Sequence, residues 1–118
     1  MIFASIQRQS DSSVLFNQAK VTQTAWERLR GLLAYPRLDD NQALLITPCS
    51  SVHMFGMRYP LDIAYLNKAG EVIKTVASLR PLAISMCWGA SATLEMPVNA
   101  LSKHNIQKGD VLTWERNE

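Results

Sequence analysis

A nine-residue stretch of the chain, from Cys49 to Met57, concentrates side chains that could do chemistry. It contains a thiol, an imidazole and two thioethers, in the sequence CSSVHMFGM. Cys, His and Met bind soft metal ions such as Cu(I), and a Cys beside a His can form a nucleophile and its general base. The residue types therefore suggest a soft-metal site at Cys49, His53 and Met57, or a catalytic Cys49–His53 pair.

The spacing of these three residues restricts both hypotheses. They are four residues apart, so on an extended strand successive members would lie about 13 Å from each other, too far to hold one ion. On a helix they would lie about 6 Å apart, but Gly56 and Pro60 disfavour a continuous helix. Either site would need a loop or bulge, and the catalytic pair would also need an orienting group such as Asp62 or Glu95. The simpler alternative is a buried Cys and Met beside a hydrogen-bonded His.

Asp62 and Glu95 are unusual because each interrupts an apolar, strand-like run. Two carboxylates with raised pKa values could do general acid and base work, as in glycosidases. Each could equally accept hydrogen bonds from backbone N–H groups or pair with a basic residue, because a buried carboxylate needs such a partner. The candidate cations are Arg30, Arg58 and Arg80, and Arg58 is the first expected partner of Asp62.

The composition is typical of one globular domain over residues 1–118, with 47% hydrophobic and 19% charged residues. The chain has no apolar run long enough for a transmembrane helix and no signal peptide at its start, so we expect a cytoplasmic location. Its twelve basic and ten acidic residues are scattered, which argues against a nucleic-acid partner. Since the apolar runs are short, no membrane partner is expected either, and an unknown small molecule or protein remains. Cys49 and Cys87 could be free thiols or a disulfide. No Cys-x-x-Cys motif is present and no cofactor is expected.

Most of the chain has the pattern of short strands separated by turn residues, which predicts a mainly β fold. We expect a small antiparallel sandwich or barrel with one packed helix over residues 24–34. Thr24 and Glu27 form a capping box for that helix, and Pro97 can begin a second helical turn that ends near residue 104. The turn from Asn67 to Gly70 predicts the clearest hairpin. The expected strands cover residues 2–7, 13–21, 43–46, 61–66, 72–79, 83–88, 92–96 and 111–114.

Five short elements of the sequence occur in an order that is characteristic of a known family. The elements are Arg30-Gly31-Leu32-Leu33, the stretch from Cys49 to Arg58, Pro60-Leu61-Asp62-Ile63 with Tyr65-Leu66, Leu94-Glu95-Met96-Pro97, and Gly109-Asp110. Over roughly residues 20–112 this order resembles domain-of-unknown-function family one hundred and ninety-two, a group of small prokaryotic proteins. The resemblance implies a compact, mostly β domain with no established enzymatic activity, so it assigns no catalytic residue.

The chain departs from the family pattern at three positions. Asn99 stands where the family usually has Gly, and Asn tolerates a left-handed backbone better than most residues. Leu33 replaces a Met, a change that conserves volume and so indicates packing rather than sulfur chemistry. Met54 stands where a Thr is often found, which removes a hydroxyl from the candidate site.

These patterns together favour a non-catalytic ligand-binding or accessory protein whose site lies on a face shared by His53, Met57 and Asp62. The alternatives are the small hydrolase-like enzyme and the soft-metal site described above. The predicted ligand-binding residues are His53, Met57, Arg58, Asp62, Glu95 and Arg30.

Overall fold

The computed structural model describes residues 2–24, 37–54 and 57–117, and it confirms a mainly β fold. The predicted helix over residues 24–34 lies almost entirely outside the described residues. The described elements are β1 (Ile2–Arg8), β2 (Val14–Val21), β3 (Gln42–Ile46), β4 (Ser51–His53), β5 (Leu61–Leu66), β6 (Val72–Leu79), β7 (Ile84–Met86), β8 (Ala92–Pro97), α2 (Ala100–Lys103) and β9 (Leu112–Arg116).

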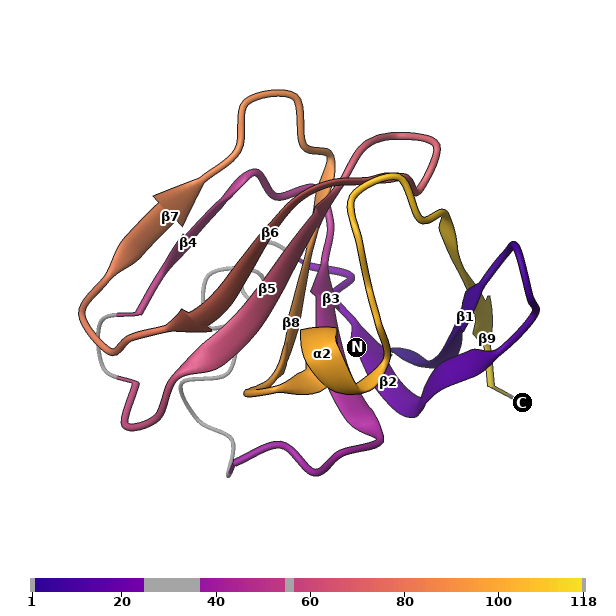
Figure 1. Ribbon diagram of the computed structural model, residues 1–118, viewed down its shortest axis with the longest axis horizontal. Coiled ribbons are helices and arrows are strands. Elements are labelled where there is room, and N and C mark those ends of the chain that lie inside the picture. Colours follow the sequence, from indigo (N-terminus) through magenta and orange to yellow (C-terminus); the bar gives the residue numbers. More distant parts are fainter. Residues whose placement is uncertain (1, 25–36, 55–56, 118) are drawn as a thin grey trace.

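Seven of the strands form one sheet in the order β6-β5-β8-β3-β2-β1-β9, and β4 pairs with β7 in a small second sheet (Figure 1). All the pairs are antiparallel except β2 and β3, which are parallel. The sheet is therefore mixed, whereas the sequence analysis expected antiparallel strands throughout. The reason is the long connection between β2 and β3, since parallel neighbours need a crossover rather than a tight turn.

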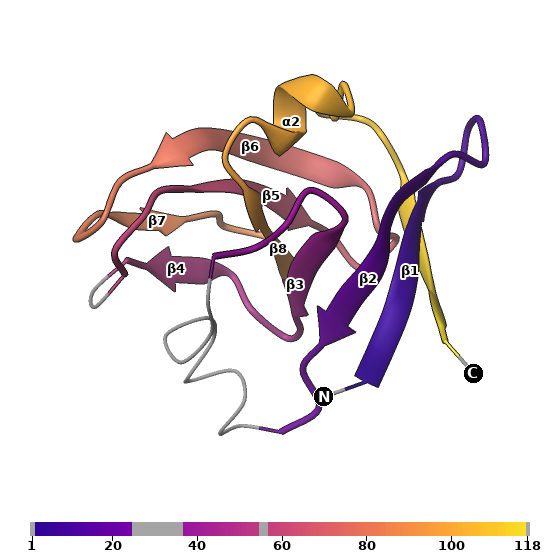
Figure 2. The same cartoon turned by 90° about the horizontal axis from the view of Figure 1, so that it is seen from below.

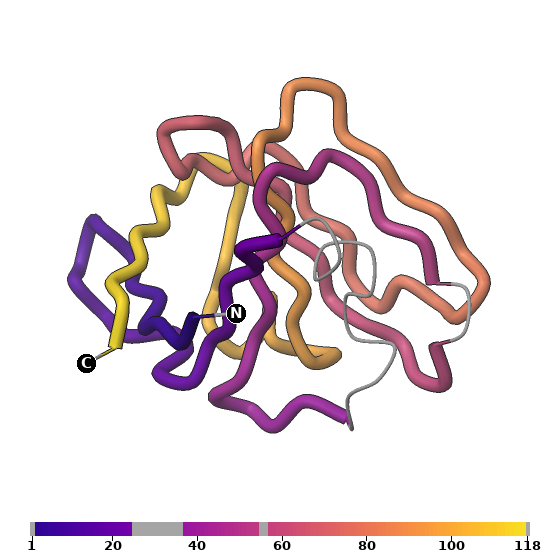
Figure 3. The backbone as a smooth tube through the Cα atoms, turned by 180° about the vertical axis from the view of Figure 1, so that it is seen from behind, coloured from indigo at the N-terminus to yellow at the C-terminus, as the bar shows by residue number. Residues whose placement is uncertain are grey.

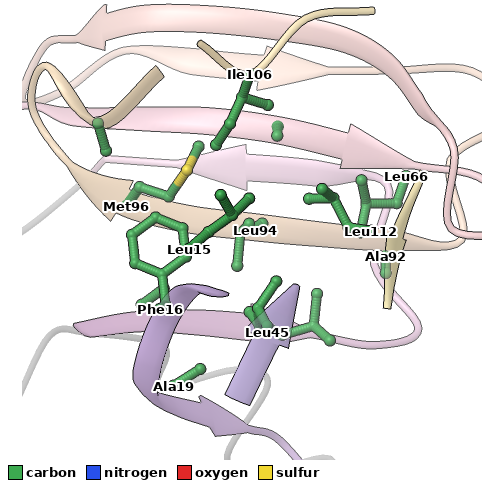
Figure 4. Packing of buried hydrophobic residues seen from close by; sticks show 14 of the residues in the cluster. Leu15, Phe16, Ala19, Leu45, Leu66, Ala92, Leu94, Met96, Ile106 and Leu112 are labelled. Carbon is green, nitrogen blue, oxygen red and sulfur yellow. The ribbon is translucent and has the colours of Figure 1, made fainter. Parts of the chain in front are cut away.

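The central strands β3, β5 and β8 are buried on both faces, so the molecule has two apolar clusters separated by one sheet. Alternate side chains along a strand point to opposite faces. On one face Leu45, Leu66 and Leu94 pack against β1, β2 and the region of α2, as Figure 4 shows. On the other face Leu44, Ile63 and neighbouring residues pack beneath the β4–β7 pair. Continuous apolar runs such as the one in β5 follow directly from this double burial.

The hairpin between β5 and β6 turns at Asn67 and Gly70, as predicted. Gly70 has a positive φ of 84°, and a Cβ there would lie 2.5 Å from the Leu112 carbonyl oxygen, so only glycine fits. This close approach brings the two edges of the large sheet together at one end, where an isolated bridge joins Glu71 to Val111. The described strands do not close into a barrel.

The predicted second helical turn is α2, although it begins at Ala100 because Pro97 still belongs to β8. Asn99 precedes it with φ 76°, which confirms that the position needs a left-handed backbone. Figure 2 shows α2 above β5 and β8, and β4 on the opposite side of β5. Among the described residues, no helix is long and apolar enough to span a membrane.

Candidate functional site

Asp62 is buried in β5, with 1% of its surface exposed, and both of its carboxylate oxygens accept hydrogen bonds. The backbone N–H of Ser78 donates to Oδ1 at 2.9 Å, and the backbone N–H of Leu101 donates to Oδ2 at 3.0 Å. No described basic residue forms an ion pair with this carboxylate. Of the two alternatives for Asp62, the backbone partner is therefore present and the expected Arg58 ion pair is not.

Both donors to Asp62 lie at irregular points of the backbone. Ser78 has a φ of 52° and falls where the pairing of β5 with β6 shifts register. Leu101 lies in the first turn of α2, whose N-cap residue Asn99 makes no side-chain capping bond. Since the first N–H groups of a helix have no intrahelical partner, Asp62 serves as the cap from a distant strand. The carboxylate thus connects three elements, β5, β6 and α2.

Glu95 is also buried, with 6% of its surface exposed, but its surroundings are different. It lies on β8 opposite Ile63 of β5 and Leu44 of β3, so its neighbours on both sides are apolar. Among the described residues, no group donates a hydrogen bond to its carboxylate. Burial raises the pKa of Glu95 to about 7, because the charged form is penalised in an apolar environment.

The two carboxylates lie on opposite faces of the large sheet. Asp62 pairs in register with Met96, and its neighbour Ile63 pairs with Glu95, so alternation directs the two acids to different sides. Asp62 faces α2 and Glu95 faces the cluster under β4 and β7. They cannot act together on one substrate as an acid and base pair, which is one of the two arrangements that the hydrolase-like alternative offered, the other being the Cys49–His53 pair.

Cys49, His53 and Met57 differ in their surroundings. Cys49 and Met57 are partly buried against the second apolar cluster, and the Cys49 thiol donates to the Ser51 carbonyl at 3.0 Å. His53 is exposed on β4, opposite Ile84 of β7. In the part of the chain that the structure describes, no three side chains of His, Cys, Asp or Glu are placed to hold a metal ion.

Cys49 and Cys87 are free thiols, which answers the question of a disulfide that the sequence left open. Both lie in the second apolar cluster near Tyr65, whose hydroxyl donates to the Ser85 Oγ at 2.8 Å. Burial raises the pKa of Tyr65, and the two thiols add to this effect.

A pocket of about 270 Å³ lies beside Tyr59 and the end of β8. Tyr59 forms part of its wall, and the Arg37 guanidinium carbon lies 5.2 Å from the centre of the Tyr59 ring. Burial raises the pKa of Tyr59, as does the nearby Glu95 carboxylate, while Arg37 lowers it. The lining residues are Arg37, Leu38, Asp40, Tyr59, Pro60, Pro97 and Val98.

None of the five predicted ligand-binding residues that the structure describes lines this pocket, although Arg58 is the chain neighbour of Tyr59 and Glu95 is within electrostatic reach of it. Arg58 is exposed, and Arg30 lies outside the described residues. Sequence reasoning overlooked Tyr59 and Val98 because an aromatic or a valine has no chemical signature of its own. The available signal was the pair of prolines: Pro60 immediately precedes β5, and Pro97 ends β8 opposite Leu61, the first residue of β5.

Comparison with known proteins places this arrangement in a family. The profile of the DUF192 family, described as "Uncharacterized ACR", matches residues 6–114. The chain belongs to the DUF192 family. A DUF192 resemblance was expected from five short elements, and the match over most of the chain confirms it.

Three relatives show how far this DUF192 protein resembles others. The UPF0127 protein of Thermococcus sibiricus is 30% identical over 117 residues, covering 93% of this chain and 74% of the relative. A crystal structure of a protein of unknown function from Novosphingobium aromaticivorans has a TM-score of 0.80 at 22% identity, covering 95% of this chain and 84% of the other. A proposed transcription regulator from Sinorhizobium meliloti has a TM-score of 0.81 at 15% identity, covering 96% of this chain and 92% of the other. At these identities the two structures establish the shared fold.

Proposed function

We propose that this DUF192 protein is a cytoplasmic, non-catalytic binding domain for a small organic anion with one apolar group, held in the pocket at Tyr59. The observation that carries the proposal is the pocket itself, with apolar walls and one cation over its aromatic wall. The hydrolase-like alternative has less support, because the carboxylates Asp62 and Glu95 lie on opposite faces of the sheet.

The size and walls of the pocket restrict the ligand. Sites for drug-sized molecules occupy about 300–1,000 Å³, and the pocket here has about 270 Å³. Leu38, Val98 and the two prolines supply apolar surface, and the Tyr59 ring supplies a flat one. A single aromatic ring or a short branched chain is the apolar group that fits such a space.

The charges at the rim favour an anion. Arg37 is exposed at the rim and carries one positive charge. Asp40 carries a negative charge, but Lys103 forms an ion pair with it at 3.0 Å, so these three groups sum to one positive charge. A guanidinium over an aromatic wall can hold a carboxylate in a defined orientation, because its N–H groups match the two oxygens.

Glu95 gives the proposal a dependence on pH. Its pKa is about 7, so the carboxyl is neutral below that value and becomes negative above it. A negative charge near Tyr59 would repel a bound anion, so binding should weaken as the pH rises through 7. In Glu95→Gln the side chain stays neutral and this dependence should disappear.

The experiment is an NMR titration of the labelled protein with benzoate, and with benzamide as the neutral probe of the same shape. We expect benzoate to shift the amide signals of Leu38, Tyr59 and Val98, and to bind at least about fivefold more tightly than benzamide, a difference of about 1 kcal/mol. Arg37→Gln should remove this preference, and Val98→Trp, at an exposed pocket residue, should block both probes by filling the space.

One control and two contrary outcomes complete the experiment. Lys68→Gln removes an exposed cation that does not line the pocket and should leave both affinities unchanged. Shifts located elsewhere, or equal binding of benzoate to the native protein and to Val98→Trp, would place the ligand at another site. No shift at millimolar benzoate or benzamide, or at short branched acids such as isovalerate, would refute a small-anion site in this pocket.

A further inference from the structure

Strand β7 carries a stripe of apolar side chains that no other described element covers. Ile84 and Met86 alternate along the strand and are each 66% exposed. Leu82 before the strand is 71% exposed and Trp88 after it is 99% exposed. We call these four residues the β7 stripe. Exposed apolar groups in a single continuous row are rare on soluble domains and usually mark an interaction surface.

Each end of β7 adjoins a turn that contains one residue of the β7 stripe. The Ala83 N–H donates to the Arg80 carbonyl, and Leu82, at the third position of that turn, has a φ of 73°. The Ala90 N–H donates to the Cys87 carbonyl, and Gly89 has a φ of 91° at the same position. Both are type II turns, which favour glycine at this point.

The first of these turns is the informative one. Leu82 occupies the glycine position, where a side chain costs conformational energy, and yet its side chain gains no burial in the fold. A small or polar residue would satisfy the turn better. The Leu side chain is therefore explained by something outside the chain rather than by packing within it.

The charges around the β7 stripe are of one sign. Residues 41–61 and 72–94, which include β3, β4, β6, β7 and the start of β8, contain no Asp or Glu. They contain Arg58, Lys74 and Arg80, all exposed, and the Lys74 ammonium donates to the Met86 carbonyl at 2.8 Å within the stripe. The exposed acids that the structure describes lie in other segments, at Asp11, Asp39, Asp40 and Glu115.

We propose that the β7 stripe docks this protein onto the surface of an anionic membrane. A fully exposed Trp at a loop tip, aliphatic side chains beside it and a surround of Lys and Arg are the groups that enter the headgroup region of such a bilayer. The β7 stripe is a row of protruding side chains, which distinguishes it from a peptide-binding groove. None of its residues lines the pocket at Tyr59. A second copy of the chain fits less well, because the two cationic surrounds would repel each other.

The pattern of residues in the sequence does not predict this surface, and no membrane partner was expected from it. Membrane helices and signal peptides are found as continuous apolar runs, whereas the β7 stripe alternates with Ala83, Ser85 and Cys87. Only the exposure of alternate residues in the folded chain makes them a surface. The inference is independent of the small-anion site, which lies in a different part of the molecule.

The test is co-sedimentation of the purified protein with vesicles of phosphatidylcholine alone and of phosphatidylcholine mixed with phosphatidylglycerol. We expect binding to the mixed vesicles only. Trp88→Ser should reduce the partition coefficient about tenfold or more, and Arg80→Gln should reduce it about fivefold. Both side chains are exposed, so neither change should alter the fold, which circular dichroism checks.

Matched controls and alternative occupants complete the test. Trp114→Ser removes an indole that is 36% exposed on β9, at the other end of the molecule (Figure 3), and Lys68→Gln removes a cation outside the region. Both should bind as the native protein does. The proposal is overturned if mixed vesicles are not bound, or if Trp88→Ser binds them unchanged. It is also overturned if the protein binds polyglutamate but not vesicles, or forms a dimer that Trp88→Ser abolishes.

Discussion

Asp62 and Glu95 are both buried acids on neighbouring strands, but they face opposite sides of the sheet and differ in the hydrogen-bond donors that reach them. On the α2 side, Asp62 receives two backbone N–H groups and holds a helix start and an irregular strand in place. On the β4–β7 side, Glu95 lies between Leu44 and Ile63 without a described donor, and its pKa rises to about 7. One acid connects elements of the fold through its hydrogen bonds, and the other destabilises the fold when charged.

The difference shows that burial alone does not decide the role of a carboxylate. An ionised group is stable in the interior only when donors replace the water that it has lost. Asp62 has such donors because a helix and a strand irregularity each leave an N–H without a partner beside it. Glu95 lies against regular strands, whose N–H groups are already used in the sheet. The first acid is therefore structural, and the second can respond to pH.

The largest effect is expected from Asp62→Ala, which would test the structural role directly. The change removes two hydrogen bonds to a charged acceptor and leaves the N–H groups of Ser78 and Leu101 without partners, so we expect a loss of about 3–5 kcal/mol in the free energy of unfolding. Urea denaturation at pH 8 measures it. Glu115→Ala, at an exposed acid on β9, should change stability by less than about 0.5 kcal/mol. A small loss in Asp62→Ala would show that water or a rearranged helix replaces the carboxylate.

Glu95→Gln tests the other side through the dependence of stability on pH. Burial raises the pKa of Glu95 from 4.5 to about 7. As the pH rises, the unfolded chain therefore releases this proton at a lower pH than the folded chain does. The stabilising effect of the protonated form is fully present below pH 4.5 and is lost as the pH rises to and through 7. Glu95→Gln should therefore match the native protein near pH 4.5 and exceed it by about 3 kcal/mol at pH 8.

The native protein and Glu95→Gln must be compared at each pH, because a second group also affects the dependence of stability on pH. Burial lowers the pKa of His104, with Lys103 and Arg8 adding to the effect, so protonation of His104 destabilises the fold as the pH falls. That contribution is the same in both proteins and cancels in the difference. A difference that does not grow between pH 4.5 and pH 8 would mean that Glu95 ionises without penalty, in contact with a donor.

Asp62→Asn sharpens the comparison, because it is the same chemical change as Glu95→Gln at the other acid. An Asn has one acceptor oxygen and one NH2 group, so one of the two backbone donors would lose its partner. We expect a loss of about 1–3 kcal/mol at pH 8, where Glu95→Gln should gain stability. Opposite signs in paired urea titrations are the expected result. Equal signs would remove the distinction between the two faces.

The smallest effect concerns the residue before α2. Asn99 has a φ of 76°, where glycine is free of strain, so Asn99→Gly should raise the free energy of unfolding by less than about 1 kcal/mol. Thermal denaturation of the two proteins measures the shift. Ala100→Gly, one residue further on, enters the helix at a buried position and should destabilise instead. A destabilised Asn99→Gly would indicate that the Asn side chain contributes a contact.

Much of the fold could be predicted from residue patterns, because the patterns follow from local geometry. Alternation and turn residues located every described strand except the short β4, Asn67 to Gly70 located a hairpin, and Asn99 was expected to tolerate a left-handed conformation, as found. The parallel pairing of β2 with β3 was not predicted, because it depends on a long connection whose course local pattern does not determine. The candidate site was harder to predict from the sequence, because the pocket at Tyr59 is formed by segments that are distant in the chain.

The sequence by itself determined which residues are unusual, namely a cluster of Cys, His and Met and two acids in apolar strands. It also determined the family, because five short elements keep their order over the chain. Only the tertiary structure decided what the unusual residues do. Strand alternation and pairing register place Asp62 and Glu95 on opposite faces, and a helix start supplies donors to one acid alone. Partners that are 16 and 39 residues away determine whether a buried charge is stabilised, and no local pattern specifies them.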